Sequence, residues 1–191
     1  MQTKVAQEQT AELPSNNQAV APTTNPNLVR NPSFENITNT WQDTNCNYMA
    51  LSAGSTSIPY WTVAANTVNQ IVWAMTPTCD GYTAAVGTFF IDLTGFGSES
   101  PNGAVQQRLK NLVVGRPYDF SIDVKTDRQP PLVTIAGAAI TLNAGRKFTR
   151  GNTVWTVYTG SFVAQSASPV LEIQNQAFEI ELIDNVVVRE Q

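Results

Sequence analysis

The stretch Ala84–Val124, AAVGTFFIDLTGFGSESPNGAVQQRLKNLVVGRPYDFSIDV, decides the fold of this chain. It contains three runs that read as strands, separated by a turn rich in glycine and by a short loop. In the third run, from Tyr118 to Val124, apolar and polar residues alternate with a period of two. Such alternation is typical of a strand with one buried face and one wet face. We therefore expect this stretch to form the central sheet of a β-structure.

The segments on either side of this stretch predict more short strands and no helix longer than a turn or two. The runs with strand character are Tyr60–Val63, Asn69–Met75, Thr153–Ala164, Val170–Ile173 and the closing run Phe178–Val188. Leu132–Leu142 is either one bent strand or two short ones. Eight or nine short strands with polar turns between them indicate an all-β, two-sheet antiparallel jelly-roll sandwich. The segment 36–59 is expected to be a long irregular loop.

The chain divides into an N-terminal arm and one folded domain. Residues 1–26 are rich in Gln, Asn, Thr, Ala and Pro and are too poor in apolar residues to order themselves alone. We expect this arm, 1–26, to extend from the sandwich, 27–191, and to dock on a partner in an assembly, such as a neighbouring chain. A homo-oligomer is one form that this assembly could take.

The charge of the chain argues against several partners. The formal net charge is -4, and the eleven Lys and Arg residues are scattered singly. A basic stripe of the kind that binds a phosphate backbone is therefore missing, and we expect no nucleic-acid partner. No apolar run is long enough to span a membrane. The first twenty residues lack the apolar core of a secretory signal, which predicts synthesis in the cytoplasm; we expect the final location to be a virion or an extracellular surface.

Cys46 and Cys79 lie in polar, irregular surroundings. They leave two alternatives open. The pair forms a disulfide between two loops if the protein reaches an oxidising medium, or it stays unbridged. A metal site built on these two residues is the weaker interpretation, because the chain has no histidine to complete it.

Several short motifs, taken together and in order, resemble the galactose-binding-like jelly rolls, and more narrowly the carbohydrate-binding modules that open with Asn-Gly-Ser-Phe-Glu and close with an Asp-Asn-Val strand. They are Asn31-Pro-Ser-Phe-Glu35, Pro59-Tyr-Trp61, Ile91-Asp-Leu-Thr-Gly95, Val105-Gln-Gln107, Leu112-Val-Val-Gly-Arg-Pro-Tyr-Asp-Phe120, Trp155 to Phe162 and Leu182-Ile-Asp-Asn-Val186. The chain departs from the pattern at Pro32, where the family has glycine, and in its longer first loop. The resemblance implies a fold and a binding habit, and no enzyme activity.

The resemblance also implies a structural calcium ion near the first and last strands. Its carboxylate ligands would be Glu35 and Asp184, with backbone carbonyls supplying the remaining oxygens. The alternative is that Asp184 caps a turn and that Glu35 pairs with an arginine, such as Arg30 or Arg189. Apart from this ion, we expect no cofactor.

The titratable residues do not predict catalysis. Without histidine the chain lacks the commonest general base. Asp119 and Asp123 lie four residues apart on one strand, about 13 Å apart along it, too far for either class of glycosidase. We interpret them as a solvated face and expect the protein not to be an enzyme.

The aromatic residues in loops and at strand ends are candidates for sugar contact, because sugars are often recognised by flat apolar faces surrounded by polar groups. The candidates are Trp41, Tyr48, Tyr60, Trp73 and Tyr82, whereas Trp61, Tyr118 and Trp155 are assigned to the core.

Two functions follow from these observations. The first is a non-catalytic structural or attachment protein of a larger assembly, namely a bacteriophage virion, docked by residues 1–26. The alternative is a free-standing carbohydrate-binding module that recognises a surface glycan.

Overall fold

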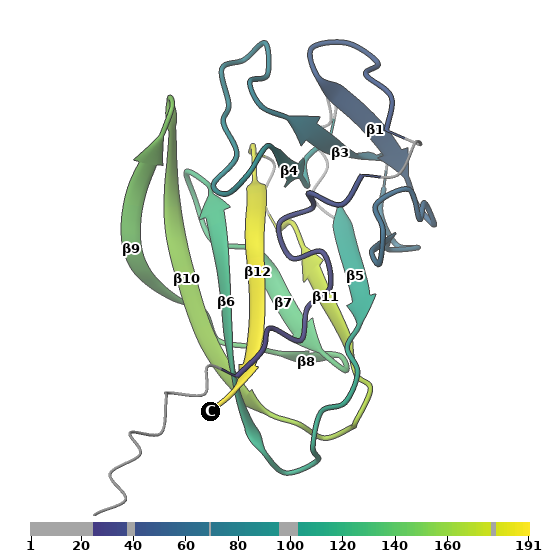
Figure 1. The fold of residues 1–191 in the computed structure, drawn as a ribbon, viewed down its shortest axis with the longest axis vertical. Helices are drawn as coiled ribbons and strands as arrows, with labels where there is room; N and C mark the ends of the chain where they lie inside the picture. The colour runs from purple at the N-terminus through teal and green to yellow at the C-terminus, as the bar shows by residue number, and fades with distance from the viewer. Residues whose placement is uncertain (1–24, 38–40, 69, 96–102, 177–178) are drawn as a thin grey trace, which may run out of the picture.

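The computed structural model describes residues 25–37, 41–68, 70–95, 103–176 and 179–191. Within them the chain forms two antiparallel sheets that pack face to face (Figure 1). The seven-stranded sheet has the order β1 (Tyr48–Ser52), β3 (Gln70–Met75), β4 (Phe89–Asp92), β12 (Leu182–Glu190), β6 (Pro117–Lys125), β10 (Thr153–Val163) and β9 (Asn143–Arg150). The five-stranded sheet has the order β2 (Thr62–Val63), β5 (Ala104–Arg108), β11 (Val170–Gln174), β7 (Leu132–Ile135) and β8 (Ala138–Ala139). The predicted all-β sandwich is confirmed.

The main core lies between the two sheets and follows from the period-2 pattern. On β6 the side chains of Tyr118, Phe120, Ile122 and Val124 all point into it and are at most 1% exposed. Tyr118 also stacks on Phe162 of β10, with ring centroids 5.6 Å apart. Burial of one such face against a second sheet is the main source of stability in a sandwich.

The stretch Ala84–Val124 does not form one sheet. β4 and β6 belong to the seven-stranded sheet, whereas β5 lies between β2 and β11 in the five-stranded sheet. The expected central sheet is therefore wrong in detail, because the chain crosses the sandwich twice within this stretch. Alternation gives the buried face of each strand but not its sheet, since both sheets bury their inner faces in the same core.

Two strands are missing from the sequence prediction. β1 lies inside the segment 36–59, which was expected to be irregular, and it pairs with β3 from Tyr48↔Ala74 to Ser52↔Gln70. β9 is largely exposed and pairs with β10. Both are edge strands, in which the hydrophobic pattern is weak. The open alternative over Leu132–Leu142 resolves into β7 and β8, joined through Gly137 at φ +82°.

The start of the described chain lies beside β12 (Figure 1). The backbone N–H of Leu28 donates to the carbonyl of Val188 at 2.9 Å, and the N–H of Val186 donates to the carbonyl of Pro32 at 2.8 Å. This segment thus pairs with the edge of β12 that β4 leaves open. The predicted docking arm, 1–26, lies outside the described residues except for Asn25 and Pro26.

Candidate functional site

The outer face of the seven-stranded sheet is divided into a covered half and an open half. The loop 76–88, between β3 and β4, covers the first half (Figure 1). Ala84 and Ala85 from this loop pack with Phe90, Trp155 and Leu182 from the sheet in a second hydrophobic cluster. The loop therefore turns an outer face into a small second core, and it leaves only the other half of the face available to a ligand.

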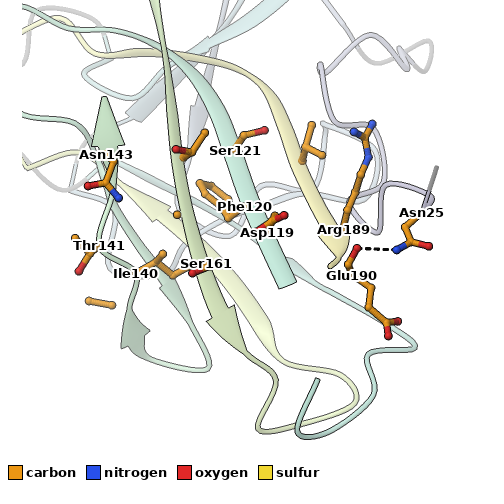
Figure 2. Close-up of a pocket in the computed structure, with 14 residues that line it drawn as sticks. Asn25, Asp119, Phe120, Ser121, Ile140, Thr141, Asn143, Ser161, Arg189 and Glu190 are labelled. Atoms are coloured by element: carbon orange, nitrogen blue, oxygen red, sulfur yellow. Dashed lines mark hydrogen bonds between the residues drawn. The ribbon is translucent and has the colours of Figure 1, made fainter. Parts of the chain in front are cut away.

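The open half forms a groove of about 930 Å³ (Figure 2). We call it the polar groove. Its floor consists of outward-pointing side chains on three adjacent strands. Ser161, Asp119 and Arg189 form one cross-strand row of this floor, and Thr159, Ser121 and Val187 form the next. The groove is lined by Asn25, Asp119, Phe120, Ser121, Ala139, Ile140, Thr141, Asn143, Thr159, Gly160, Ser161, Val187, Arg189 and Glu190.

The segment between β8 and β9 forms one wall of the polar groove. Ile140 packs against β10 at Gly160, where a Cβ atom would collide with the Ile140 side chain and the Thr141 carbonyl. Glycine at this position therefore lets the segment cross β10 closely, which brings Thr141 and Asn143 to the groove.

The other wall of the groove is formed where the two ends of the described chain meet. The Asn25 side-chain amide donates to the Glu190 carbonyl at 2.7 Å, as Figure 2 shows. Beside it, the Gln191 side-chain amide donates to Asp119 Oδ1 at 2.6 Å. Arg116 pairs with Glu190 at 3.3 Å. These contacts hold polar groups at the groove edge without filling it.

The structure does not bring the five predicted aromatic residues together. Trp73 is 0% exposed, and Tyr48 is 9% exposed. Trp41 is half-buried and packs edge-on against Phe89, with centroids 5.7 Å apart, while Tyr82 packs against the second cluster. Only Tyr60 among the five is exposed, at 47%. None of them lines the polar groove. The sequence feature that indicates the groove is instead the small polar residues at alternate positions of its strands.

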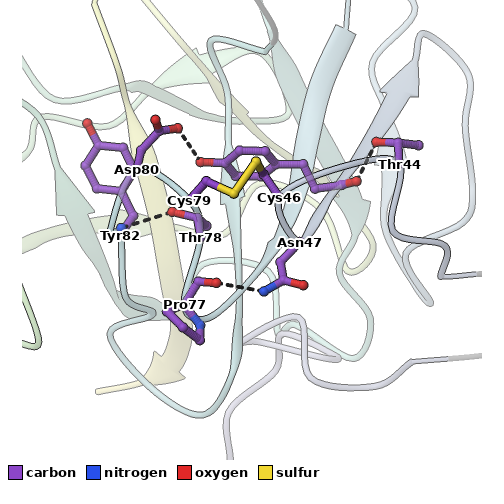
Figure 3. Close-up of a disulfide and its surroundings, with 9 residues drawn as sticks. Thr44, Cys46, Asn47, Pro77, Thr78, Cys79, Asp80 and Tyr82 are labelled. Atoms are coloured by element: carbon purple, nitrogen blue, oxygen red, sulfur yellow. Dashed lines mark hydrogen bonds between the residues drawn. A yellow bond between two sulfur atoms is a disulfide. The ribbon is translucent and has the colours of Figure 1, made fainter.

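Of the two alternatives for the cysteines, bridged or unbridged, the structure shows the disulfide. Cys46 and Cys79 are bonded, with their Cα atoms 5.0 Å apart (Figure 3). The bridge ties the chain before β1 to the covering loop after β3. Beside it the Tyr48 hydroxyl donates to Asp80 Oδ2 at 2.8 Å, and burial raises the pKa of Tyr48 to about 12. The Asn47 side-chain amide donates to the Pro77 carbonyl at 2.7 Å. This cluster anchors the covering loop.

Glu35 and Asp184, the predicted calcium ligands, both bind the end of the covering loop. Glu35 Oε1 accepts the backbone N–H groups of Thr88 and Phe89, each at 2.7 Å. Asp184 Oδ2 accepts the N–H of Val86 at 2.9 Å. The alternative that Glu35 pairs with an arginine is wrong, because it bonds backbone amides instead.

The residues around Asp184 provide the negative charge that a cation site needs, but only part of the oxygen ligands. Burial and the charges of Asp123 and Glu35 raise the pKa of Asp184 well above its usual value. A bound cation would relieve this cost. However, Asp184 Oδ1 also accepts the N–H of Asn185, at 2.6 Å. Over the described residues, no group of three His, Cys, Asp or Glu side chains is arranged to hold a metal. The calcium ion stays a prediction.

The structure also contains buried carboxylates that the sequence pattern does not predict. Asp123, expected on a solvated face, is only 3% exposed, because Asn185 lies over it and donates to its Oδ2 at 3.0 Å. Glu181 is 0% exposed, and neither of its side-chain oxygens has a hydrogen-bond partner. Burial and the neighbouring charge of Asp92 raise the pKa of Glu181 to about 8.

The fold and the groove define an all-β sandwich with a polar groove on one outer face. The chain belongs to the family described as "Protein of unknown function (DUF642)", whose model matches residues 27–189. This match covers nearly all of the predicted sandwich. The residues that the structure describes include no helix with the length and apolarity needed to cross a membrane.

The chain is similar to a curated relative and to several solved structures, two of which are described below. Halomucin of Haloquadratum walsbyi is 32% identical over 151 residues, which are 76% of this chain and 2% of halomucin. The CBM22-1 xylan-binding domain of Paenibacillus barcinonensis Xyn10C is 17% identical, with a TM-score of 0.42 over 75% of this chain and 92% of that domain. A putative sugar binding protein from Bacteroides thetaiotaomicron is 16% identical, with a TM-score of 0.45 over 87% of this chain and all of that protein, 100%.

Proposed function

We propose that this chain is a carbohydrate-binding domain that holds a glycan in the polar groove. The observation that carries the proposal is the open groove of about 930 Å³ whose floor consists mostly of polar side chains from β6, β10 and β12. Ligand sites commonly have about 300–1,000 Å³ of space and a few polar groups placed on rigid elements.

The chemistry of the polar groove suits sugar hydroxyl groups. Ser121, Thr159 and Ser161 both donate and accept hydrogen bonds, Asn143 adds an amide, and Asp119 accepts. A sugar chain offers alternating donors and acceptors along its length, so a flat sheet face can bind several of its residues. Contacts of this exposed, wet kind give millimolar to micromolar affinity, roughly 4 to 8 kcal/mol.

Two further observations support this reading. The motifs at Asn31–Glu35 and Leu182–Val186 resemble those of carbohydrate-binding modules and lie side by side, where the N–H of Val186 donates to the Pro32 carbonyl. The disulfide persists only in an oxidising medium in most organisms. We therefore place the working protein outside the cytoplasm, at a surface where glycans are found.

The virion prediction receives no support. It rested on an N-terminus without an export signal, on an adhesive type of fold and on docking by residues 1–26, of which 1–24 lie outside the described residues. The groove and the disulfide favour the glycan-binding alternative. That the protein is not an enzyme stays a prediction, which a screen for glycan hydrolysis would check.

A steric block of the groove tests the proposal. We would screen the full chain on a glycan array and measure the hits by calorimetry, with xylohexaose, cellohexaose and mannohexaose as soluble probes. Ser161→Trp places a large side chain in the groove, and Asp119→Ala removes an acceptor. Val154→Trp is the matched control, because Val154 lies on the same strand, is 52% exposed and does not line the groove.

We expect Ser161→Trp to abolish binding, Asp119→Ala to weaken it about tenfold, and Val154→Trp to leave it unchanged. Near-identical melting temperatures would show that all three variants are folded. Silence across the array, or equal binding by Ser161→Trp and Val154→Trp, would refute the proposal.

A further inference from the structure

A second, smaller hollow lies on the outer face of the five-stranded sheet, away from the polar groove. It has a volume of about 340 Å³ and is lined by Arg30, Tyr60, Thr62, Gln106, Gln107, Arg108, Lys110 and Val170. In register, Thr62 of β2 is opposite Gln106 of β5, and Arg108 is opposite Val170 of β11. We call this surface the Tyr60 site.

Tyr60 is presented to solvent by a backbone conformation that is unusual for a tyrosine. Its φ is +73°, in the left-handed region that residues other than glycine rarely adopt, and its side chain is 47% exposed. The turn around it is fixed, because the N–H of Trp61 donates to the Ile58 carbonyl at 3.0 Å and the Asn31 amide donates to the Pro59 carbonyl at 3.2 Å. Strain of about 1–3 kcal/mol held in place by its surroundings often marks a functional position.

The two arginines of the Tyr60 site are held in place by the protein. The Arg30 guanidinium lies 3.5 Å from the centre of the Tyr60 ring. The buried Gln107 side chain fixes the Arg30 backbone, since its oxygen accepts the Arg30 N–H and its amide donates to the Arg30 carbonyl, both at 2.8 Å. Arg108 donates to the Ser168 carbonyl at 2.9 Å. Guanidinium groups positioned in this way lose little entropy when they bind a ligand.

The charge of this site is opposite to that of the whole chain. The formal net charge is -4, yet Arg30, Arg108 and Lys110 gather here. Among the described residues, the ion pairs found are Arg116–Glu190, Lys125–Asp127 and Arg128–Glu179, so these three cations are not neutralised by a carboxylate. A local cluster of unpaired cations attracts anionic ligands.

A neighbouring hollow indicates which end of the Tyr60 site would hold an anion. It has a volume of about 670 Å³, shares Gln106, Arg108 and Val170 with the first, and also includes Glu172. Gln106 is opposite Glu172 across β5 and β11. The acidic end would repel a negative group, so an anion is held at the end formed by Arg30, Arg108 and Lys110.

We propose that the Tyr60 site binds a saccharide that carries carboxylate groups, namely a uronic-acid unit of a glycan. The choice of a saccharide rests on the proposed function. Tyr60 is exposed and holds the Arg30 guanidinium against its ring, so it offers a sugar only the part of its apolar surface that Arg30 leaves uncovered. Thr62 and Gln106 offer hydrogen bonds, and the guanidinium groups match a planar carboxylate. The protein would then have two binding faces, one for hydroxyl groups and one for acidic units.

The test compares two hexasaccharides that differ only in charge. One is a hexamer of β-1,4-linked glucuronic acid, and the other is cellohexaose, which has the same backbone without the carboxylates. Calorimetry on the full chain would use Arg108→Gln and Tyr60→Asn, the latter chosen because asparagine tolerates positive φ. Lys147→Gln is the matched control, since Lys147 is an exposed cation on β9.

We expect the acidic hexamer to bind at least tenfold more tightly than cellohexaose, and Arg108→Gln to lose about tenfold of that affinity, as for one charged hydrogen bond. Tyr60→Asn should also weaken binding, whereas Lys147→Gln and Ser161→Trp should not. Equal affinity for both hexamers, an equal loss in Lys147→Gln, or equal binding of a sulfated hexamer of the same charge would overturn the proposal. Cellohexaose binding that only Ser161→Trp abolishes would leave the polar groove standing and remove the Tyr60 site alone.

Discussion

Replacement of Glu181 by glutamine should change how the stability of this protein depends on pH. Glu181 is 0% exposed, and neither side-chain oxygen has a hydrogen-bond partner. Burial first, and then the charge of Asp92, raise its pKa from 4.5 to about 8. The folded state therefore keeps a proton on Glu181 that the unfolded chain has already released at neutral pH.

The sign of the effect follows from the protons bound in each state. Between about pH 4.5 and pH 8 the folded protein holds one more proton at Glu181 than the unfolded chain, so the free energy of unfolding falls as the pH rises. Each pH unit in this window costs about 1.4 kcal/mol. From pH 5 to pH 8 the loss is on the order of 4 kcal/mol. Asp92, whose pKa burial raises to about 6, acts in the same direction at lower pH.

Urea denaturation of the wild type and of Glu181→Gln at pH 5 and at pH 8 measures this loss. We expect the variant to be about as stable as the wild type at pH 5, because the neutral carboxyl and the amide are then both buried without partners, and to be the more stable protein at pH 8. Glu172→Gln, on the open face of the five-stranded sheet, is the control. If Glu181→Gln and the wild type lose the same stability between the two pH values, the reasoning is wrong.

Three further predictions concern the calcium ion, the disulfide and the core. If calcium binds, chelation should lower the melting temperature of the wild type but not that of the Glu35→Gln, Asp184→Asn double variant. Calorimetry that detects no calcium binding would refute this prediction. Reduction of the bridge between Cys46 and Cys79, 33 positions apart, should cost about 4 kcal/mol of stability in urea titrations, and no change would contradict it. Trp73→Ala should destabilise the fold by about 3–5 kcal/mol in urea titrations. A variant that is as stable as the wild type but has lost glycan binding would contradict the assignment of Trp73 to the core.

The fold could be predicted because its main information is local. The alternation from Tyr118 to Val124 requires one buried face, and several such runs with turns between them require a second sheet to cover them. β1 and β9 escaped prediction because edge strands need few apolar residues, and their pairing is decided by β3 and β10.

The candidate sites could be predicted only in part. The resemblance predicts that Glu35 and Asp184 lie at one place in the fold. In the structure both carboxylates accept backbone N–H groups from the same loop, at Thr88 and Val86 respectively. Of the aromatic candidates only Tyr60 is exposed, because a sequence does not show whether a loop tryptophan is covered. Trp73 lies on a central strand and is fully buried.

The sequence by itself determined that this chain is an all-β sandwich, because the period-2 pattern of a strand fixes which side chains must leave water. Only the tertiary structure decided which residues line the two hollows proposed as ligand sites. The polar groove unites Asp119 with Asn143 and Arg189, and the Tyr60 site unites Arg30 with Arg108. These residues are far apart in the chain, and they meet because sheet order and loop crossings bring them together, which no local pattern encodes.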